Sequence, residues 1–153
     1  MVLTEESLLK LLHGIHIHVD PLKALEGLPE DQATAEPWPE ARFPYQLLTH
    51  MVYWQDYSLA LIEGTPPQHE EGRDWEPTGE TWRELTNRFK AGLESLERHA
   101  SGKLDRRLEV AEGLSTTVAA EIMGVAQHNS YHLGQLVQAR KALGSWPPEP
   151  EYA

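Results

Sequence analysis

The C-terminal part of the chain carries its longest helical pattern, and this pattern constrains the fold more than any other feature. Hydroxyl side chains at residues 115–117 predict a helix N-cap, and Gly144 predicts the C-terminal end. The Trp-Pro-Pro sequence at 146–148 prevents the helix from resuming. Between these limits apolar residues recur with a helical period at Val118, Ile122, Val125, Leu133, Leu136 and Leu143. Such a stripe is typical of a helix that packs in a bundle.

Three further helical segments precede this one. Their apolar residues also follow a helical period, and each segment ends beside a glycine. We expect these helices over residues 4–13, 44–63 and 81–100. Asp20 followed by Pro21 predicts a short additional helix, because aspartate caps a helix and proline is favoured at the first position.

The connections between these segments are long. Residues 27–43 and 65–80 are rich in proline and are expected to be loops, and residues 103–114 form a connection that could be extended around Leu104 and Leu108. Amphipathic helices without convincing strand alternation predict an all-α fold, namely a four-helix bundle with long loops between the helices. At 153 residues the chain is expected to form a single domain over residues 1–153.

Charge and cysteine content exclude several classes of function. The 13 basic and 24 acidic residues give a net charge of −11, which argues against nucleic acid or an anionic membrane surface as a partner. The absence of cysteine excludes disulfides, thiolate metal ligands and a cysteine nucleophile, so any thiol chemistry would use a thiol brought by a substrate. Neither a signal peptide nor a membrane-spanning run is recognisable, and we expect a cytoplasmic protein.

Two histidines on the longest predicted helix indicate a metal site. His128 and His132 are four residues apart, so both imidazoles lie on one helix face and can reach one ion. By the helical period they fall on the edge of the apolar stripe, where a bundle places side chains that look into a cleft. His50 lies on the flank of the apolar face of the helix at 44–63 and is the candidate third ligand. Three imidazoles would leave a divalent ion Lewis acidic, with one position open for chemistry.

Each of these histidines also has a purely structural interpretation. A pair spaced by four residues can equally be two half-buried side chains bonded to neighbours, and a lone His50 would more often pack than bind an ion. The combination of three on the flanks of two helices favours the metal. His16 and His18 could line the pocket or contact substrate, or have surface and capping roles. The histidines assigned to solvent are His13, His69 and His99.

Polar residues on the same helix are candidates for supporting roles. Glu121, about two turns before His128, could accept a hydrogen bond from an imidazole or act as a general base, or could be a plain surface glutamate. Gln135 lies on the ligand side and could bond a ligand residue or a substrate. Tyr131 is expected to point away from the histidines and to pack.

The tryptophans are expected to serve mainly as anchors. Trp54 follows His50 by one turn and could form a wall of the metal pocket. Three others, Trp38, Trp75 and Trp146, are expected to pin the long loops onto the helices.

Three segments of this sequence resemble the DinB/YfiT-like family of metalloenzymes, a superfamily of four-helix bundles. They are QLLTH at 46–50, HNSYHLGQL at 128–136 and LGSWPP at 143–148. The resemblance covers nearly the whole chain in order, and the second segment is fairly specific. It implies a divalent metal, commonly nickel or zinc, held by the residues His50, His128 and His132, and a homodimer. Iron and manganese also suit imidazole ligands.

The activity that follows from the resemblance is open, because relatives include stress-induced proteins, S-transferases that use bacillithiol or mycothiol, thiol-dependent isomerases and hydrolases. Our first hypothesis is a metal-dependent enzyme that activates a low-molecular-weight thiol for transfer to a small electrophilic substrate. The alternative within enzymes is hydrolysis by metal-activated water with Glu121 as the base. A third hypothesis is a non-catalytic binder of a metal or small molecule in a stress response.

Overall fold

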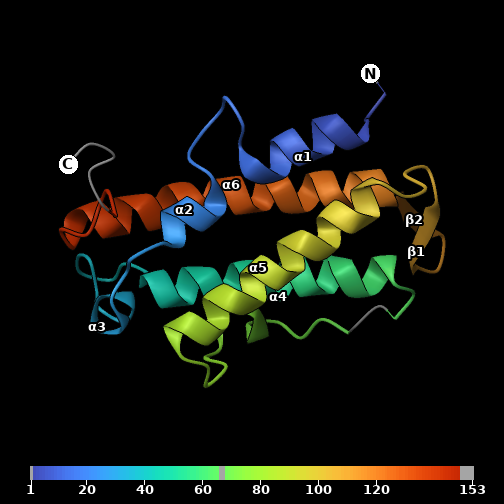
Figure 1. Ribbon diagram of the computed structural model, residues 1–153. Coiled ribbons are helices and arrows are strands. Elements are labelled where there is room, and N and C mark those ends of the chain that lie inside the picture. The colour runs from blue at the N-terminus through green and yellow to red at the C-terminus, as the bar shows by residue number, and fades with distance from the viewer. Residues whose placement is uncertain (1, 66–67, 149–153) are drawn as a thin grey trace.

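The computed structural model describes residues 2–65 and 68–148 and is mostly helical (Figure 1). Pro66 and Pro67 of the expected loop, and residues 1 and 149–153 of the expected domain, lie outside the described residues. In chain order the elements are α1 (Glu5–His13), α2 (Pro21–Leu25), α3 (Glu30–Ala33), α4 (Pro44–Ile62), the 3-10 turn η1 (Arg73–Trp75), α5 (Trp82–Ala100), β1 (Arg107–Ala111), β2 (Leu114–Thr117) and α6 (Val118–Ala142).

The four longest helices pack around one apolar core. In Figure 1, α1 lies along α6, α4 lies below α6, and α5 crosses in front of both. Their facing sides bury a continuous set of side chains that includes Leu8, Leu12, Leu48, Met51, Phe89, Leu93, Ile122 and Leu136. Burial of these stripes supplies the main stabilising contribution, because each fully buried aliphatic or aromatic side chain contributes about 1.5–3 kcal/mol.

The helix boundaries follow from capping residues that the sequence displays. Thr4 caps α1, and Gly14 ends it in the left-handed conformation with a φ of 62°. Asp20 accepts the hydrogen bond of the Leu22 amide and caps α2, as its position before Pro21 predicts. Thr117 caps α6 by accepting from the Ala120 amide.

Three short elements differ from the sequence-based expectation. The described residues are mostly helical, as predicted, but β1 and β2 form an antiparallel hairpin that leads into α6, which the all-α prediction did not include. Leu108 and Val110 of β1 are more buried than the residues beside them, but this alternation is confined to five residues and is therefore a weak signal. Helix α3 and the turn η1 lie inside segments expected to be loops, and both are too short to show a helical period.

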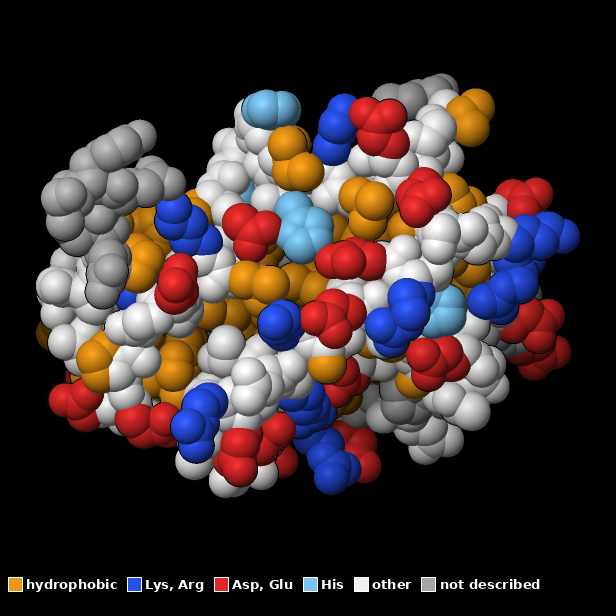
Figure 2. Space-filling view, in the orientation of Figure 1, with side chains coloured by type: hydrophobic (Ala, Val, Ile, Leu, Met, Phe, Trp, Pro, Cys, Tyr) orange, Lys and Arg blue, Asp and Glu red, His pale blue; other side chains and the backbone are white. Residues whose placement is uncertain are grey.

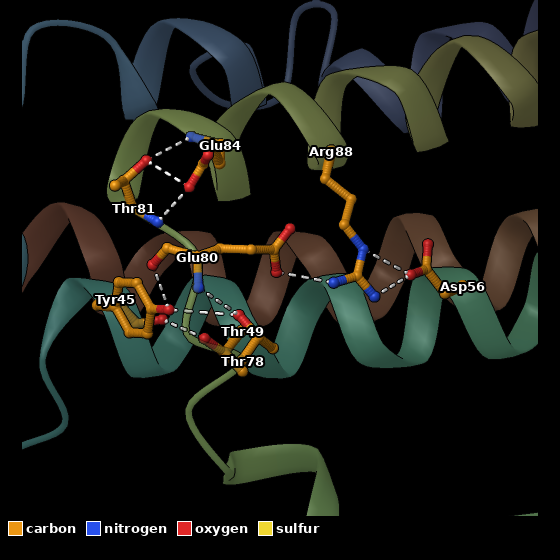
Figure 3. A network of polar contacts seen from close by, with 8 residues as sticks. All are labelled: Tyr45, Thr49, Asp56, Thr78, Glu80, Thr81, Glu84 and Arg88. Atoms are coloured by element: carbon orange, nitrogen blue, oxygen red, sulfur yellow. Dashed lines mark hydrogen bonds and ion pairs between the residues drawn. The ribbon is translucent and has the colours of Figure 1, made fainter.

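The contact between α4 and α5 includes a polar network at the surface (Figure 3). Arg88 of α5 reaches Asp56 of α4 at 2.6 Å and Glu80 at 2.8 Å. Tyr45 donates a hydrogen bond to the backbone oxygen of Glu80 at 2.7 Å. The network fixes the segment before α5 onto the N-terminal half of α4.

A buried amide lies where α4, α5 and α6 approach one another. Gln55 is 0% exposed, donates to the backbone oxygen of Phe89 at 2.9 Å and accepts from Asn129 at 3.4 Å. Gly92 of α5 provides the space, because a Cβ at that position would overlap the Gln55 amide. The glycine therefore permits the close contact between the two helices.

A buried arginine of α6 connects the C-terminal end of α2 with the segment that follows α6. Arg140 is 0% exposed and donates to the backbone oxygens of Ala24, Glu26 and Ser145 at 2.7–2.8 Å. Three carbonyl acceptors compensate much of the cost of burying the guanidinium. Burial nevertheless lowers the pKa of Arg140.

The surface shown in Figure 2 mixes acidic and basic side chains, with apolar side chains visible between them. Such a face has no single charge sign that would attract a polyanion. None of the helices in the described part of the chain combines the length and apolar character needed to cross a bilayer.

His13, which the sequence analysis assigned to solvent, is instead held between two carboxylates. Its Nδ1 atom lies 2.6 Å from Asp20, and its Nε2 atom lies 2.7 Å from Glu97 of α5. The sequence could not reveal this contact, because Glu97 is 84 residues away. Burial disfavours the imidazolium, but the hydrogen bonds and charges of Asp20 and Glu97 raise the pKa of His13 above its ordinary value.

This arrangement predicts a pH-dependent contribution to stability. Since the folded-state pKa is raised, the stabilisation is fully present below the unfolded value of about 6.5 and is lost as pH rises through the folded pKa. We expect the free energy of unfolding of His13→Gln to differ most from that of the wild type at about pH 6 and least at about pH 9. Urea denaturation across this range measures it. The control is His16→Gln on an exposed histidine, and a pH-independent difference for His13→Gln would contradict the prediction.

Candidate metal centre

The structure brings together the three histidines singled out from the sequence. His50 comes from α4, and His128 and His132 come from consecutive turns of α6. The ring centroid of His50 lies 4.9 Å from that of His128 and 4.5 Å from that of His132. His50 and His132 are each 7% exposed, so the cluster lies at the edge of the core.

The three imidazoles present their potential ligand atoms to a common region. The Nε2 atoms of His50 and His128 are 3.1 Å apart, and the three potential ligand atoms lie within 4.8 Å of one another. Two imidazole nitrogens on a tetrahedral ion with bonds of about 2.05 Å would lie about 3.3 Å apart. The spacing therefore fits a shared divalent ion.

The Nδ1 atoms of His132 and His50 lie beside polar side chains that favour the orientation of these two rings. His132 Nδ1 lies 2.7 Å from the Gln135 side-chain oxygen, which can only accept, so Nδ1 carries the proton and the Nε2 lone pair faces the cluster. His50 Nδ1 lies 3.0 Å from Asp74 Oδ2, an ion-pair distance, although its N–H is not aligned for a hydrogen bond. Within residues 2–65 and 68–148, His128 Nδ1 is buried without a partner.

Asp74 and Trp75 of the turn η1 complete the surroundings of His50, and the sequence analysis missed the role of the aspartate. Asp74 is 8% exposed and also accepts a hydrogen bond from Trp54 Nε1 at 3.1 Å. Trp75 stacks on the His50 ring, with 3.9 Å between centroids and 9° between planes. Because η1 has no periodic pattern, only the presence of an Asp-Trp pair in a long loop could have pointed to it.

The environment keeps two of the imidazoles neutral. Burial, together with the neighbouring His132 and His50, lowers the pKa of His128 to about 4. Burial and His132 lower the pKa of His50, while Asp74 opposes the change. At neutral pH His128 therefore has a lone pair available to bind an electrophile such as a metal ion.

The supporting residues proposed from the sequence have different outcomes. Gln135 contacts a histidine of the cluster, as the sequence analysis considered. Trp54 reaches the cluster only through Asp74, and Trp75 is the tryptophan that contacts His50. Trp75 and Trp146 pack against the core, whereas Trp38 is 49% exposed and is not the buried anchor that was expected.

Glu121 and Tyr131 lie elsewhere than expected. The Glu121 carboxylate accepts a hydrogen bond from Ser58 at 2.9 Å. Ser58 lies two turns beyond His50 on α4, which corresponds to about 12 Å along the helix, so Glu121 is separated from the histidines. Tyr131 was expected to pack but is 68% exposed, with its ring 5.0 Å from that of His132.

The remaining histidines lie outside the cluster. His18 contacts Ser130 of α6 at 2.8 Å and the backbone oxygen of Val19, and His16 is exposed. His69 contacts Tyr53 at 3.0 Å and His99 lies 3.4 Å from Glu63, so neither is surrounded by solvent alone.

A comparison with known families now gives the class of protein. The sequence model of the DinB superfamily matches residues 20–136, which is more than half of the 153-residue chain. The protein therefore belongs to the DinB superfamily, as the sequence resemblance indicated. Neither the curated proteins nor the solved structures contained a match to the chain.

Proposed function

We propose that the protein is a metal-dependent enzyme that binds a divalent ion through His50, His128 and His132 and activates a low-molecular-weight thiol. The observation that carries the proposal is the convergence of three imidazoles, two with their Nδ1 atoms beside Asp74 and Gln135. The same superfamily membership supports a four-helix-bundle fold for the four longest helices. Zinc or nickel is the favoured ion, because imidazole ligands suit both.

An ion held by three neutral ligands would supply Lewis acidity at its open position, which lowers the pKa of a thiol or of water. The residues of this chain have separate tasks around that position. Asp74 orients His50, Gln135 orients His132, and Trp75 covers the His50 ring against solvent. In the overall reaction a sulfur–carbon bond forms, the carbon–leaving group bond breaks, and the thiol proton leaves with the product anion.

The position of Glu121, the candidate general base for hydrolysis, favours thiol transfer over hydrolysis. Glu121 is bonded to Ser58 two turns away from the histidines, so it is not placed to take a proton there. The absence of cysteine is consistent with a thiol brought in by the substrate. A homodimer, a single domain over residues 1–153 and a cytoplasmic location remain predictions.

The test combines metal analysis with a panel of thiols. The tag-free protein should bind about one divalent ion per chain, and the loaded protein should transfer bacillithiol, mycothiol or glutathione to a chloro-aromatic compound or an epoxide. Hydrolysis of esters or amides without thiol transfer would replace the proposal by the hydrolase. Metal binding with neither activity would leave a non-catalytic binder.

The contact between Asp74 and His50 gives a prediction of its own. Asp74→Asn keeps the size of the side chain and an acceptor for Trp54 but removes the charge beside His50. We expect the metal affinity to fall about 10–100-fold, the range typical when the polar group that supports a ligand is lost. Competition with a chelating dye measures it.

Asp105→Asn is the matched control, because Asp105 is an exposed aspartate in the segment before β1. Equal metal affinities for Asp74→Asn and the wild type would show that Asp74 does not support the metal.

A further inference from the structure

A pocket of about 440 Å³ is connected to the histidine cluster through residues of α6 that contact His132. Its lining comes from the segment before α4, from the N-terminal part of α4 and from α6, and includes Leu47, Tyr131 and Gln135. Gln135 is the residue bonded to His132, and the Tyr131 ring makes an edge contact with the His132 ring. The volume is within the range of about 300–1,000 Å³ that small-molecule sites occupy.

The pocket is lined mainly by apolar and aromatic surface, and two of its aromatic side chains are exposed to solvent. Trp38 is 49% exposed and Tyr131 is 68% exposed, although both are large rings that would be buried if the core needed them. Leu47 of α4 also lines the pocket and is 2% exposed. Aromatic rings exposed around a concave surface are typical of a site that binds an apolar molecule.

One cation lies at this pocket, and it has no carboxylate partner in the part of the chain that the structure describes. Arg42 lines the pocket, is exposed, and its guanidinium carbon lies 4.2 Å from the centre of the Trp75 ring. Other arginines with acidic neighbours, such as Arg73 and Arg88, are paired with glutamate or aspartate. A guanidinium stacked on an aromatic ring keeps its in-plane N–H donors free for a planar anion.

An arginine without a carboxylate partner in the described part of the chain is unexpected in a sequence with 24 acidic and only 13 basic residues. Acidic side chains outnumber basic ones nearly two to one, yet none satisfies Arg42 among residues 2–65 and 68–148. A carboxylate matches the fork of a guanidinium with two parallel hydrogen bonds. The group that completes Arg42 would then come from a ligand.

We infer that this pocket binds a molecule in which an apolar, preferably aromatic, body carries a carboxylate, with the carboxylate on Arg42 and the body against Trp38 and Tyr131. The inference rests on the proposed function in that it names the substrate class of the same site. Arg42 stacks on Trp75, and Trp75 stacks on His50, so the bound carboxylate lies two contacts away from the histidine cluster. The carboxylate can belong to the thiol or to the molecule that accepts it.

Three related probes test the charge and the source. They are phenylacetate, its neutral amide phenylacetamide, and 4-mercaptophenylacetate, each titrated by ligand-detected NMR into metal-free and metal-loaded protein. We expect phenylacetate to bind at least about tenfold more tightly than phenylacetamide, since a hydrogen-bonded charge pair is lost with the amide. Tighter binding of the thiol probe only in loaded protein would assign the carboxylate to the thiol, and equal binding of both acids would assign it to the acceptor.

Arg42→Gln should remove the preference for the carboxylate and leave metal affinity unchanged. Arg98→Gln is the matched control, because Arg98 is an exposed arginine in the last turn of α5 whose guanidinium donates to Ser95 of the same helix. Arg42→Lys, which keeps the charge without the planar fork, should give an intermediate preference. Far-ultraviolet circular dichroism confirms that the variants are folded.

Several outcomes would overturn the inference. These are equal binding of phenylacetate and phenylacetamide, an unchanged preference in Arg42→Gln, or no binding of any probe. If no probe binds and Trp38→Ala converts a dimer into a monomer, the exposed rings belong to an interface between two copies. Arg42-dependent binding of phenylacetate to a protein that neither binds metal nor transfers thiols would instead refute the proposed function while supporting the pocket.

Discussion

Replacing His132 with alanine is expected to lower the affinity for zinc or nickel by at least about a hundredfold. The loss of a direct ligand should exceed the 10–100-fold effect typical of losing a ligand's hydrogen-bonded partner. His132 is 7% exposed and lies within ligand distance of both other imidazoles, so two ligands alone would remain. Two imidazoles leave a divalent ion exchangeable with buffer and chelators. Dialysis followed by elemental analysis should find less than about one tenth of an ion per chain.

The control for this experiment is His99→Ala. His99 lies on α5, and its imidazole is 3.4 Å from Glu63, so its removal also deletes an imidazole but leaves the cluster intact. Metal content equal to that of the wild type in both variants would eliminate the histidine cluster as a metal site and with it the proposed enzyme.

The second large effect is expected on stability, from Gly92→Ala. The new methyl group would overlap the Gln55 amide, which is 0% exposed. Displacing that amide breaks its hydrogen bonds with Phe89 and Asn129. Overpacking and unsatisfied buried groups each cost about 1–3 kcal/mol, while alanine gains about 1 kcal/mol of helix propensity. We expect a net loss of about 1–3 kcal/mol in the free energy of unfolding.

Gly124→Ala separates packing from helix propensity. Gly124 is exposed in the middle of α6, and a Cβ there would meet no atom within 4 Å. This variant should therefore be stabilised by about 0.5–1 kcal/mol. Guanidinium denaturation compares the two, and a Gly92→Ala protein at least as stable as the wild type would show that the contact between α4 and α5 is loosely packed.

The main helices were predictable because their signals are local. Thr4, Asp20 and Thr81 are capping residues that stand next to the helices they cap, and Gly14 ends a helix within the same short segment. The long apolar stripe of α6 and its pair of histidines are equally local. Helix α3 and the turn η1 could not be predicted, because neither is long enough to show a helical period. The hairpin was anticipated only as a connection that could be extended, although its strands pair locally.

The candidate site shows the same division between local and distant information. His128 and His132 are one turn apart, so their common face follows from helix geometry alone. His50 joins them only because α4 packs on α6, which the flanking positions of the apolar stripes made predictable. Asp74 and Trp75 reach His50 through the path of a loop, and the exposed position of Tyr131 depends on what the neighbouring segments leave uncovered.

The side chains around the histidine cluster come from long helices and from connecting segments. The three imidazoles stand on the rigid frame of α4 and α6, whereas Asp74, Trp75 and Arg42 come from connecting segments that cross over them. Replacement of the segment that carries Arg42 would change the groups around the pocket while leaving the three imidazoles in place. Replacement of residues 73–75 would also change the surroundings of His50, because Asp74 and Trp75 contact that ring. The two connecting segments are therefore not equivalent positions for redesign.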